Sequence, residues 1–187
     1  SASPRRRELL ALLDYPFTVL SVDVEEQRRS EERPQDYVQR LARDKSQAGW
    51  LACRGEKPVL GADTIVVFEQ EVLEKPQDFV DAQRILQLLS GNTHTVMTAV
   101  ALSSEQGCEV ILVNSQVTFR KLTDDEIVRY WQSGEPADKA GAYGIQGRGG
   151  KFVSHLNGSY SAVVGLPLLE TDLLLRKYLS SHMTSDY

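Results

Sequence analysis

The chain has 187 residues, of which 41% are hydrophobic and 25% are charged, a balance typical of one globular domain with a substantial core. Its formal net charge of -5 argues against a protein that binds nucleic-acid polymers, because such proteins need a broad basic surface, whereas a small anion needs only a local basic cluster. No apolar run reaches the roughly 18 residues of a membrane span, so no membrane partner is expected. The two cysteines, Cys53 and Cys108, form no Cys-x-x-Cys pair, which indicates free thiols in a reducing cytoplasm.

Residues 1–13 predict a helix, with Ser3 as its N-cap and Pro4 in its first turn. Three consecutive arginines follow in that turn, where they oppose the positive end of the helix dipole by about 0.3–1 kcal/mol each. A bound anion would remove this conflict, because backbone N–H groups and arginines would both face it. The alternative is that the arginines extend into solvent, and this segment does not decide between the two.

Residues 17–22 predict a short strand that runs into an acidic cluster containing Asp23, Glu25 and Glu26. An acidic cluster at the end of a strand can hold Mg²⁺ or Mn²⁺. A solvated acidic loop is the more common outcome, so the cluster alone is weak evidence for a metal site.

Pro34 opens a second predicted helix, which runs to about Gln47. Lys45 continues the apolar stripe of this helix, four residues after Leu41. The side chain either extends along the surface into solvent or reaches a polar site at the edge of the core.

Residues 59–68 predict a buried strand that one ionisable residue, Asp63, interrupts. A carboxylate in an apolar strand is costly unless it is paired, hydrogen-bonded or bound to a metal. A two-residue turn at Glu69 and Gln70 predicts a hairpin whose register places Thr64 opposite Lys75. A slip of one residue would put Lys75 on the other face.

Helices and strands are mixed along the chain, with hairpins among them, which favours an α/β or α+β fold with a mixed, twisted sheet. The expected elements are a helix capped by Asp78 and ended by Gly91, antiparallel strands over 94–102 and 109–119, a helix after the capping box 123–126, a turn near 157–158, a helix over 167–178 and a frayed tail over 180–187.

Residues 134–150 are glycine-rich but match neither a Walker A loop nor a dinucleotide fingerprint. Long ordered loops are usually functional, and glycines let the backbone approach a ligand closely. Gln146 has the donor and acceptor needed to read the edge of a base. The alternative is a mobile surface loop.

The carboxylate of Asp63, the acidic cluster, the basic residues and the glycine-rich segment together suit a polyphosphate ligand. Hydrolysis of a phosphoanhydride needs neutralised phosphates, usually through a divalent metal, and an oriented water. Asp63 would orient or deprotonate that water, or bind the metal that does so. No Ser-His-Asp arrangement is evident.

Six short segments, spread in order over nearly the whole chain, resemble the motifs of the Maf family of nucleoside triphosphate pyrophosphatases. They are residues 1–6, 61–64, 74–76, 89–91, 138–147 and 164–167, which read SASPRR, GADT, EKP, LSG, DKAGAYGIQG and VGLP.

The resemblance implies hydrolysis of a nucleoside triphosphate to the monophosphate and diphosphate, with Mg²⁺, Mn²⁺ or Co²⁺ as cofactor. It also implies a single domain over residues 1–187, with an elongated, two-lobed fold similar to that of the inosine triphosphate pyrophosphatases, and a homodimer in the cytoplasm. Members of the family have an apolar strand ahead of the first motif, so a strand is expected upstream of Ser1.

Site residues follow from the resemblance position by position. Asp63 matches the general base, and Lys45 and Lys75 match catalytic positions that also face phosphate. Ser1 and Arg6 match the remaining polar and phosphate-binding positions.

The resemblance also favours the branch of the family that hydrolyses dTTP and UTP. Arg5, Thr64 and Gln146 match its specificity positions, whereas the 7-methyl-GTP branch typically has Ser-Asp-Gln at 62–64. Glu26 matches an acidic position and, with Asp63, is a candidate metal ligand. The competing hypothesis is a nucleotide-binding regulator of septum formation in which catalysis is secondary.

Overall fold

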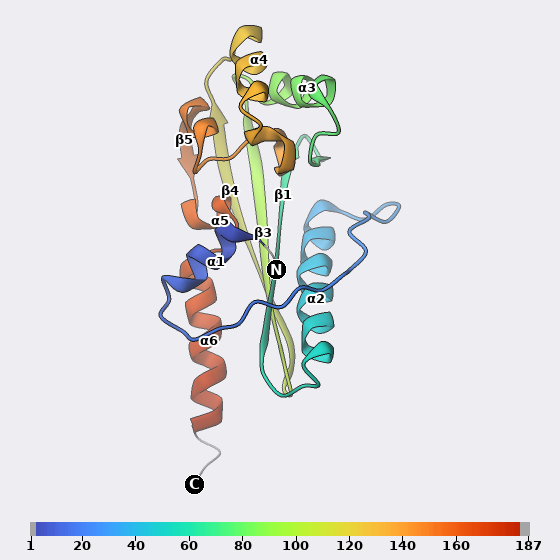
Figure 1. The fold of residues 1–187 in the computed structure, drawn as a ribbon, viewed down its shortest axis with the longest axis vertical. Helices are drawn as coiled ribbons and strands as arrows, with labels where there is room; N and C mark the ends of the chain where they lie inside the picture. The colour runs from blue at the N-terminus through green and yellow to red at the C-terminus, as the bar shows by residue number, and fades with distance from the viewer. Residues whose placement is uncertain (1–2, 184–187) are drawn as a thin grey trace.

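A five-stranded sheet forms the centre of the protein in a computed structural model that describes residues 3–183, the side chains of 182 and 183 excepted (Figure 1). Its strand order is β2-β1-β3-β4-β5. The strands are β1 (Val59–Phe68), β2 (Glu71–Leu73), β3 (Thr93–Ser104), β4 (Gly107–Phe119) and β5 (Val153–Asn157).

Every strand pairing in the described chain is antiparallel, so the expected mixed sheet is wrong. The reason lies in the connections. Two hairpins join β1 to β2 and β3 to β4, and parallel neighbours would need a crossover between strands instead. The chain leaves β2 through α3 (Phe79–Leu89) and returns along the other edge of β1 in the opposite direction.

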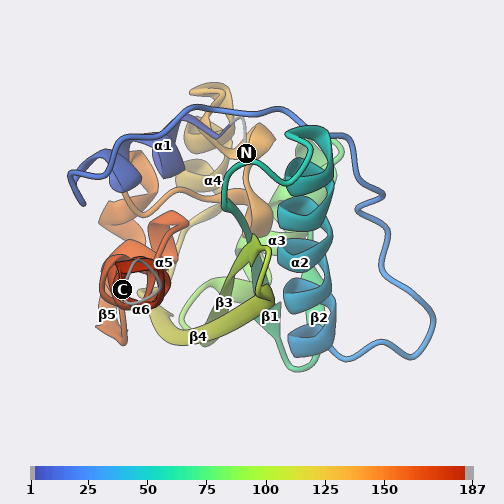
Figure 2. The same cartoon turned by 90° about the horizontal axis from the view of Figure 1, so that it is seen from below.

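Helices cover both faces of the sheet, and the molecule is elongated along its strands (Figures 1 and 2). Figure 2 shows α2 on one side and α1, α5 and α6 on the other, with the segment between α1 and α2 crossing from one side to the other. The remaining helices are α1 (Pro4–Ala11), α2 (Pro34–Ala52), α4 (Asp124–Gln132), α5 (Tyr160–Val164) and α6 (Leu168–Met183).

Helix α2 packs on β1 and β3 through its apolar stripe, in which Tyr37, Val38 and Leu41 are almost fully buried. The approach is close because Gly61 has no side chain. A Cβ at Gly61 would lie 2.5 Å from the carbonyl oxygen of Ala42 in α2. Glycine at this position of β1 therefore sets how near the helix comes to the sheet.

Several local predictions are confirmed. Phe68 pairs with Glu71, and both turn residues between them have positive φ, as a tight hairpin turn requires. The N-cap of α3 is Asp78, and α4 begins with a complete capping box. The two long strands β3 and β4 pair from end to end.

The predicted pairing of Thr64 with Lys75 is wrong, because β2 ends at Leu73 and its ladder with β1 stops at Val66. The predicted strand over 17–22 is also wrong. In the described chain this segment forms no strand and belongs to no sheet.

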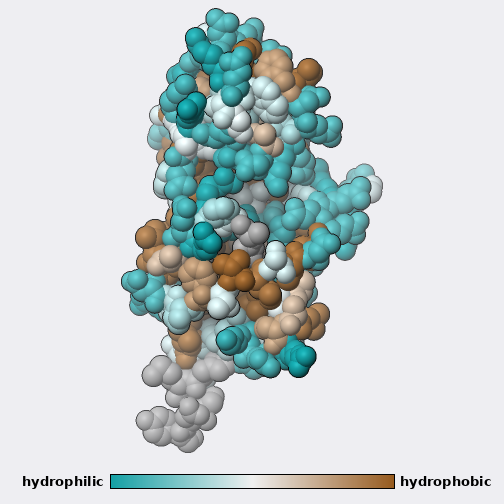
Figure 3. Space-filling view, viewed as in Figure 1, coloured by the Kyte–Doolittle hydropathy of each residue, from teal (hydrophilic) through white to brown (hydrophobic). Residues whose placement is uncertain are grey.

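Exposed hydrophobic side chains mark this extended segment, including Phe17, Val19 and Leu20. In Figure 3 hydrophobic surface gathers on the part of this face that the segment crosses. Between it and β1 lies a largely apolar cavity of about 930 Å³.

Other boundaries differ from the predictions. Helix α2 extends to Ala52, since Gly49 stays helical and packs against Val59. Helix α6 continues to Met183, so the predicted tail is helical up to that residue, and residues 184–187 lie outside the described chain. Helix α5 was not predicted. No helix in the part of the chain that the structure describes is long and apolar enough to cross a bilayer.

Candidate active-site cleft

A cleft of about 800 Å³ opens on the middle of β1, between α1, the Lys45 side of α2 and the glycine-rich segment. It gathers residues that lie far apart in the sequence. Every predicted site residue within the described chain lines it: Arg5, Arg6, Glu26, Lys45, Asp63, Thr64, Lys75 and Gln146. Ser1, the remaining predicted residue, lies outside the described chain.

Asp63 is only 8% exposed, and Lys45 supplies the compensation that its burial demands. The Lys45 Nζ atom lies 2.6 Å from Asp63 Oδ1 and 2.6 Å from Glu26 Oε1. Of the two alternatives for Lys45, the structure shows the polar site at the edge of the core. One ammonium thus bridges a strand carboxylate and a loop carboxylate.

Partial burial alone would raise the pKa of Glu26, but the hydrogen bond from Lys45 and the nearby positive charges outweigh it. The pKa of Glu26 therefore lies below its ordinary value. The backbone of the residue is also held, because the Tyr37 hydroxyl donates a hydrogen bond of 2.7 Å to the Glu26 carbonyl oxygen.

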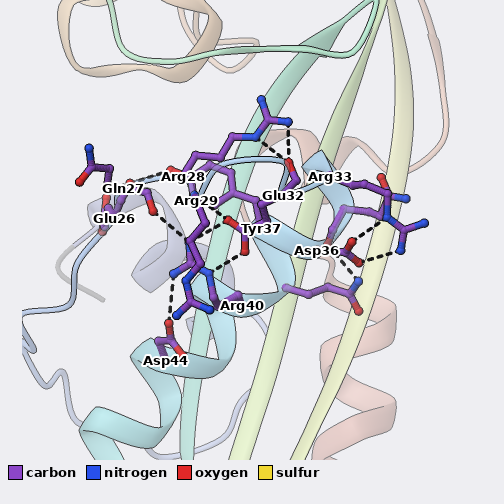
Figure 4. A network of polar contacts seen from close by, with 12 residues as sticks. Glu26, Gln27, Arg28, Arg29, Glu32, Arg33, Asp36, Tyr37, Arg40 and Asp44 are labelled. Atoms are coloured by element: carbon purple, nitrogen blue, oxygen red, sulfur yellow. Dashed lines mark hydrogen bonds and ion pairs between the residues drawn. The ribbon is translucent and has the colours of Figure 1, made fainter.

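Arg40 of α2 fixes the rest of the loop that carries Glu26 (Figure 4). Its guanidinium donates to both carboxylate oxygens of Glu32 at 2.7 and 3.0 Å and to the carbonyl oxygen of Gln27 at 3.0 Å. The hydrogen bond from Arg40 lowers the pKa of Glu32 to about 2. The guanidinium also lies over the ring of Tyr37. Sequence reasoning missed Arg40, because its spacing from Glu32 matches no known motif.

Arg6 ties α1 to the strand that carries Asp63. Its Nε donates to the carbonyl oxygen of Gly165 at 2.8 Å, and its Nη2 donates to Thr64 Oγ1 at 3.1 Å. Burial lowers the pKa of the Arg6 guanidinium. Ser3 caps the helix as predicted, and Arg5 lines the cleft while Arg7 is exposed.

The glycine-rich segment forms the opposite wall. Much of it folds into three short 3-10 helices, Glu135–Asp138, Ala140–Ala142 and Arg148–Phe152, which favours an ordered segment over the surface loop of the alternative hypothesis. Tyr143 lies within it, and its hydroxyl is 2.8 Å from Nε2 of the buried His94 in β3. Burial lowers the pKa of His94 to about 4, so this imidazole is neutral at neutral pH. Gln146 is exposed beside the cleft.

The carboxylates in the cleft bear on metal binding. In the described residues no three His, Cys, Asp or Glu side chains lie together as a ready metal site. Glu26 and Asp63 share one ammonium, so their oxygens are near one another. Two carboxylates fit an Mg²⁺ ion that takes its other ligands from phosphates and water.

Comparison with known proteins shows what the whole chain is similar to. Residues 1–178 match the model of a family described as Maf-like protein. A protein of Aliivibrio fischeri is 56% identical over 183 residues, which cover 96% of each chain, and one of Vibrio cholerae is 55% identical over 178 residues, which cover 95% of each. A protein of Yersinia pestis is 59% identical over 180 residues, which cover 96% of this chain and 91% of that one. All three carry the name dTTP/UTP pyrophosphatase.

Proposed function

Because the chain belongs to the Maf family, we propose that it is an enzyme that hydrolyses dTTP and UTP to the nucleoside monophosphate and diphosphate. One observation supports this most strongly. Lys45 holds the carboxylates of Asp63 and Glu26 in a cleft whose rim carries further cations. Such a site can bind a polyphosphate and leave a carboxylate free to act on water.

The triphosphate lies along the cleft among Arg6, Lys45 and Lys75, whose positive charges offset its own. In the free protein the Lys45 ammonium is hydrogen-bonded to Asp63. A phosphate oxygen that draws this ammonium toward itself leaves an Asp63 oxygen able to accept a proton.

Asp63 then acts as the general base. A water oxygen forms a bond to the α-phosphorus while the bond from that phosphorus to the bridging oxygen breaks. The water's proton passes to the Asp63 carboxylate, and diphosphate leaves with the bridging oxygen. The rigid place of Asp63 in a paired strand keeps the base oriented.

Recognition of the nucleotide base falls to other residues that line the cleft. Gln146 reads the edge of the pyrimidine by two hydrogen bonds, and Thr64 and Arg5 complete the specificity positions. Thr64 is held by Arg6 on one side and by Thr98, whose Oγ1 lies 3.0 Å away, on the other. A fixed Thr64 supports a site that distinguishes bases by shape.

Glu26 and Asp63 would hold a divalent cation such as Mg²⁺, Mn²⁺ or Co²⁺, which would neutralise the charge that develops on the phosphates. The protein's own contribution is to hold the two carboxylates at one end of the cleft and the cations along it.

The fold is related to that of the inosine triphosphate pyrophosphatases, and the enzyme works in the cytoplasm as a homodimer. The elongated sheet with its central cleft supports the first point. The free thiols of Cys53 and Cys108 support the cytoplasmic location.

The test is to incubate the protein with dTTP, UTP, CTP and 7-methyl-GTP in the presence of Mg²⁺ or Mn²⁺ and to measure diphosphate. We expect release from dTTP and UTP. Asp63→Asn should lower turnover by at least about a hundredfold, because the amide accepts no proton from water, while nucleotide binding persists.

Each contrary result has a distinct meaning. Binding without diphosphate release from any nucleotide would favour a nucleotide-binding regulator over an enzyme. Release from 7-methyl-GTP alone would contradict the assignment to the dTTP and UTP branch. Turnover at the wild-type rate in Asp63→Asn would place the base elsewhere.

A further inference from the structure

The carboxylate of Glu135 is enclosed by the glycine-rich segment that forms one wall of the cleft. Glu135 Oε1 accepts hydrogen bonds from the Tyr130 hydroxyl at 2.6 Å and from the Gly149 N–H at 3.0 Å. Its Oε2 accepts from the Arg148 N–H at 2.8 Å. A single side chain thus holds two successive backbone amides of the wall.

The same arrangement reaches a third backbone amide of the segment through Tyr130. The Tyr130 hydroxyl, which donates to Glu135, accepts a hydrogen bond of 3.1 Å from the Gly144 N–H. Glu135 and Tyr130 therefore contact the backbone at 144 and at 148–149. Gln146 lies between these two attachment points and is itself exposed.

The glycines of the segment are what allow its backbone to wrap so closely. A Cβ at Gly147 would overlap the Glu135 carboxylate, and one at Gly149 would lie 2.6 Å from the Tyr130 hydroxyl oxygen. These two glycines thus make room for the Glu135 carboxylate and the Tyr130 hydroxyl.

Hydrogen bonding keeps this carboxylate charged. Burial alone would raise the pKa of Glu135, but the hydrogen bonds from Tyr130 and from the two backbone amides outweigh it and hold the pKa below its ordinary value. An anion bound by backbone N–H groups makes stronger hydrogen bonds than a neutral acceptor does.

We propose that Glu135, acting with Tyr130, is the positioning residue that fixes the backbone on both sides of Gln146 and so sets recognition of the substrate base. This inference rests on the proposed function, because it concerns the specificity of that same cleft. Glu135 acts through the segment, and its role is separate from the proton transfer at Asp63.

Glu135→Gln tests the inference with little change of shape. The Gln oxygen still serves Tyr130 and Gly149, but its NH₂ group faces the Arg148 N–H, so a donor meets a donor. We expect hydrogen exchange of the amides over 144–150 to accelerate at least about tenfold. We also expect KM for dTTP to rise about tenfold with kcat within about threefold, and the preference for dTTP over CTP to fall.

Glu126→Gln is the matched control. Glu126 also accepts a backbone hydrogen bond, from the Thr123 N–H at 3.0 Å, and pairs with Arg120 at 2.7 Å, but it does not line the cleft. This variant should leave exchange over 144–150 and the nucleotide preference unchanged.

Two outcomes would overturn the inference. One is unchanged exchange over 144–150 in Glu135→Gln. The other is faster exchange with no change in the preference for dTTP over CTP, which would reduce Glu135 to a purely structural role. If the wild-type protein hydrolyses no nucleotide, the proposed function fails together with the link to base recognition, whereas the exchange experiment still decides whether Glu135 holds the segment.

Discussion

Lys45 donates to two carboxylates that come from different parts of the chain, and both bonds are 2.6 Å long. Its side chain is 14% exposed and that of Asp63 is 11% exposed, so this pair is largely removed from water. Glu26 is more open to solvent, since 53% of its side chain is exposed. The bond to Asp63 is therefore the one that matters for stability.

Removing only one partner of this pair should be harmful. Lys45→Met leaves the Asp63 carboxylate buried without its cation, so we expect unfolding free energy to fall by about 2–4 kcal/mol. Lys45→Met combined with Asp63→Asn should recover much of that loss, because no uncompensated charge remains. Urea unfolding of the single and double variants measures both, and equal stability of the two variants would contradict the pairing.

His94 makes stability depend on pH. Its pKa of about 4 in the folded protein lies below the ordinary value of about 6.5, so the unfolded chain binds the proton more readily. The stability that His94 contributes is fully present above about pH 6.5 and is lost as pH falls toward 4. In His94→Gln the slope of unfolding free energy against pH between these values should be shallower, by up to one proton. An unchanged slope would show that other groups control acid unfolding.

At the scale of elements, the contact between α2 and β1 decides where Lys45 lies. Gly61 lets the helix backbone approach the strand, and Lys45 leaves that helix between Ala42 and Ser46, the two residues that Gly61 faces. A wider separation would carry the Lys45 ammonium away from Asp63.

Gly61→Ala should therefore damage both stability and activity. The new Cβ would meet backbone atoms of Ala42 and Ser46 at 2.5 Å, which only a shift of the helix can relieve. We expect a loss of about 2–4 kcal/mol in unfolding free energy, with slower diphosphate release.

Gly49→Ala is the comparison for this experiment. There the new Cβ would meet the Val59 Cγ1 atom at 2.7 Å, the end of a side chain that can rotate away. Alanine also favours a helix over glycine by up to about 1 kcal/mol. This variant should be close to neutral, and a similar loss in both variants would argue against a special role for Gly61.

Local signals in the sequence predicted the elements well. The capping box at Thr123 and Glu126 and the turn at Glu69 and Gln70 involve neighbours in the chain, whose chemistry acts whatever lies around them. Residues 17–22 failed, because a strand exists only where another strand pairs with it, and composition does not tell where partners lie.

The site was predicted mainly from the resemblance to a family and from the energetic cost of Asp63. Residues that act indirectly were missed. Arg40 and Glu135 look like ordinary surface charges in the sequence, and their roles depend on a loop folding back onto them. The environment of the Lys45 side chain was ambiguous for the same reason. Helical spacing predicted its direction but not the carboxylates of Glu26 and Asp63 that it contacts.

At the scale of the whole molecule, the cleft combines parts of unequal rigidity. Asp63 and Thr64 lie in β1, which pairs with β3 over nine residues, from Val59 to Val67. The segment between α1 and α2 carries Glu26 and has no strand pairing in the described chain. The general base, Asp63, is therefore held more firmly than the segment that carries Glu26.

Heating should therefore loosen the less firmly held part of the cleft at a lower temperature than the sheet. The segment between α1 and α2, which has no strand pairing in the described chain, should open before the sheet does. We expect diphosphate release to be lost several degrees below the midpoint of the far-ultraviolet circular dichroism transition. Bound nucleotide should reduce this temperature difference, because it stabilises the intact cleft. Coincidence of the two transitions without nucleotide would show that the molecule unfolds as one unit.

The extended segment that crosses the face of the molecule thus affects how the protein loses activity on heating. A warmed sample can keep the spectrum of an intact sheet and yet be inactive, because the carboxylate stays in its strand while its surroundings have loosened. Such inactivation should reverse on cooling. It becomes permanent where the exposed side chains of Phe17, Val19 and Leu20 meet those of another molecule before the segment settles back.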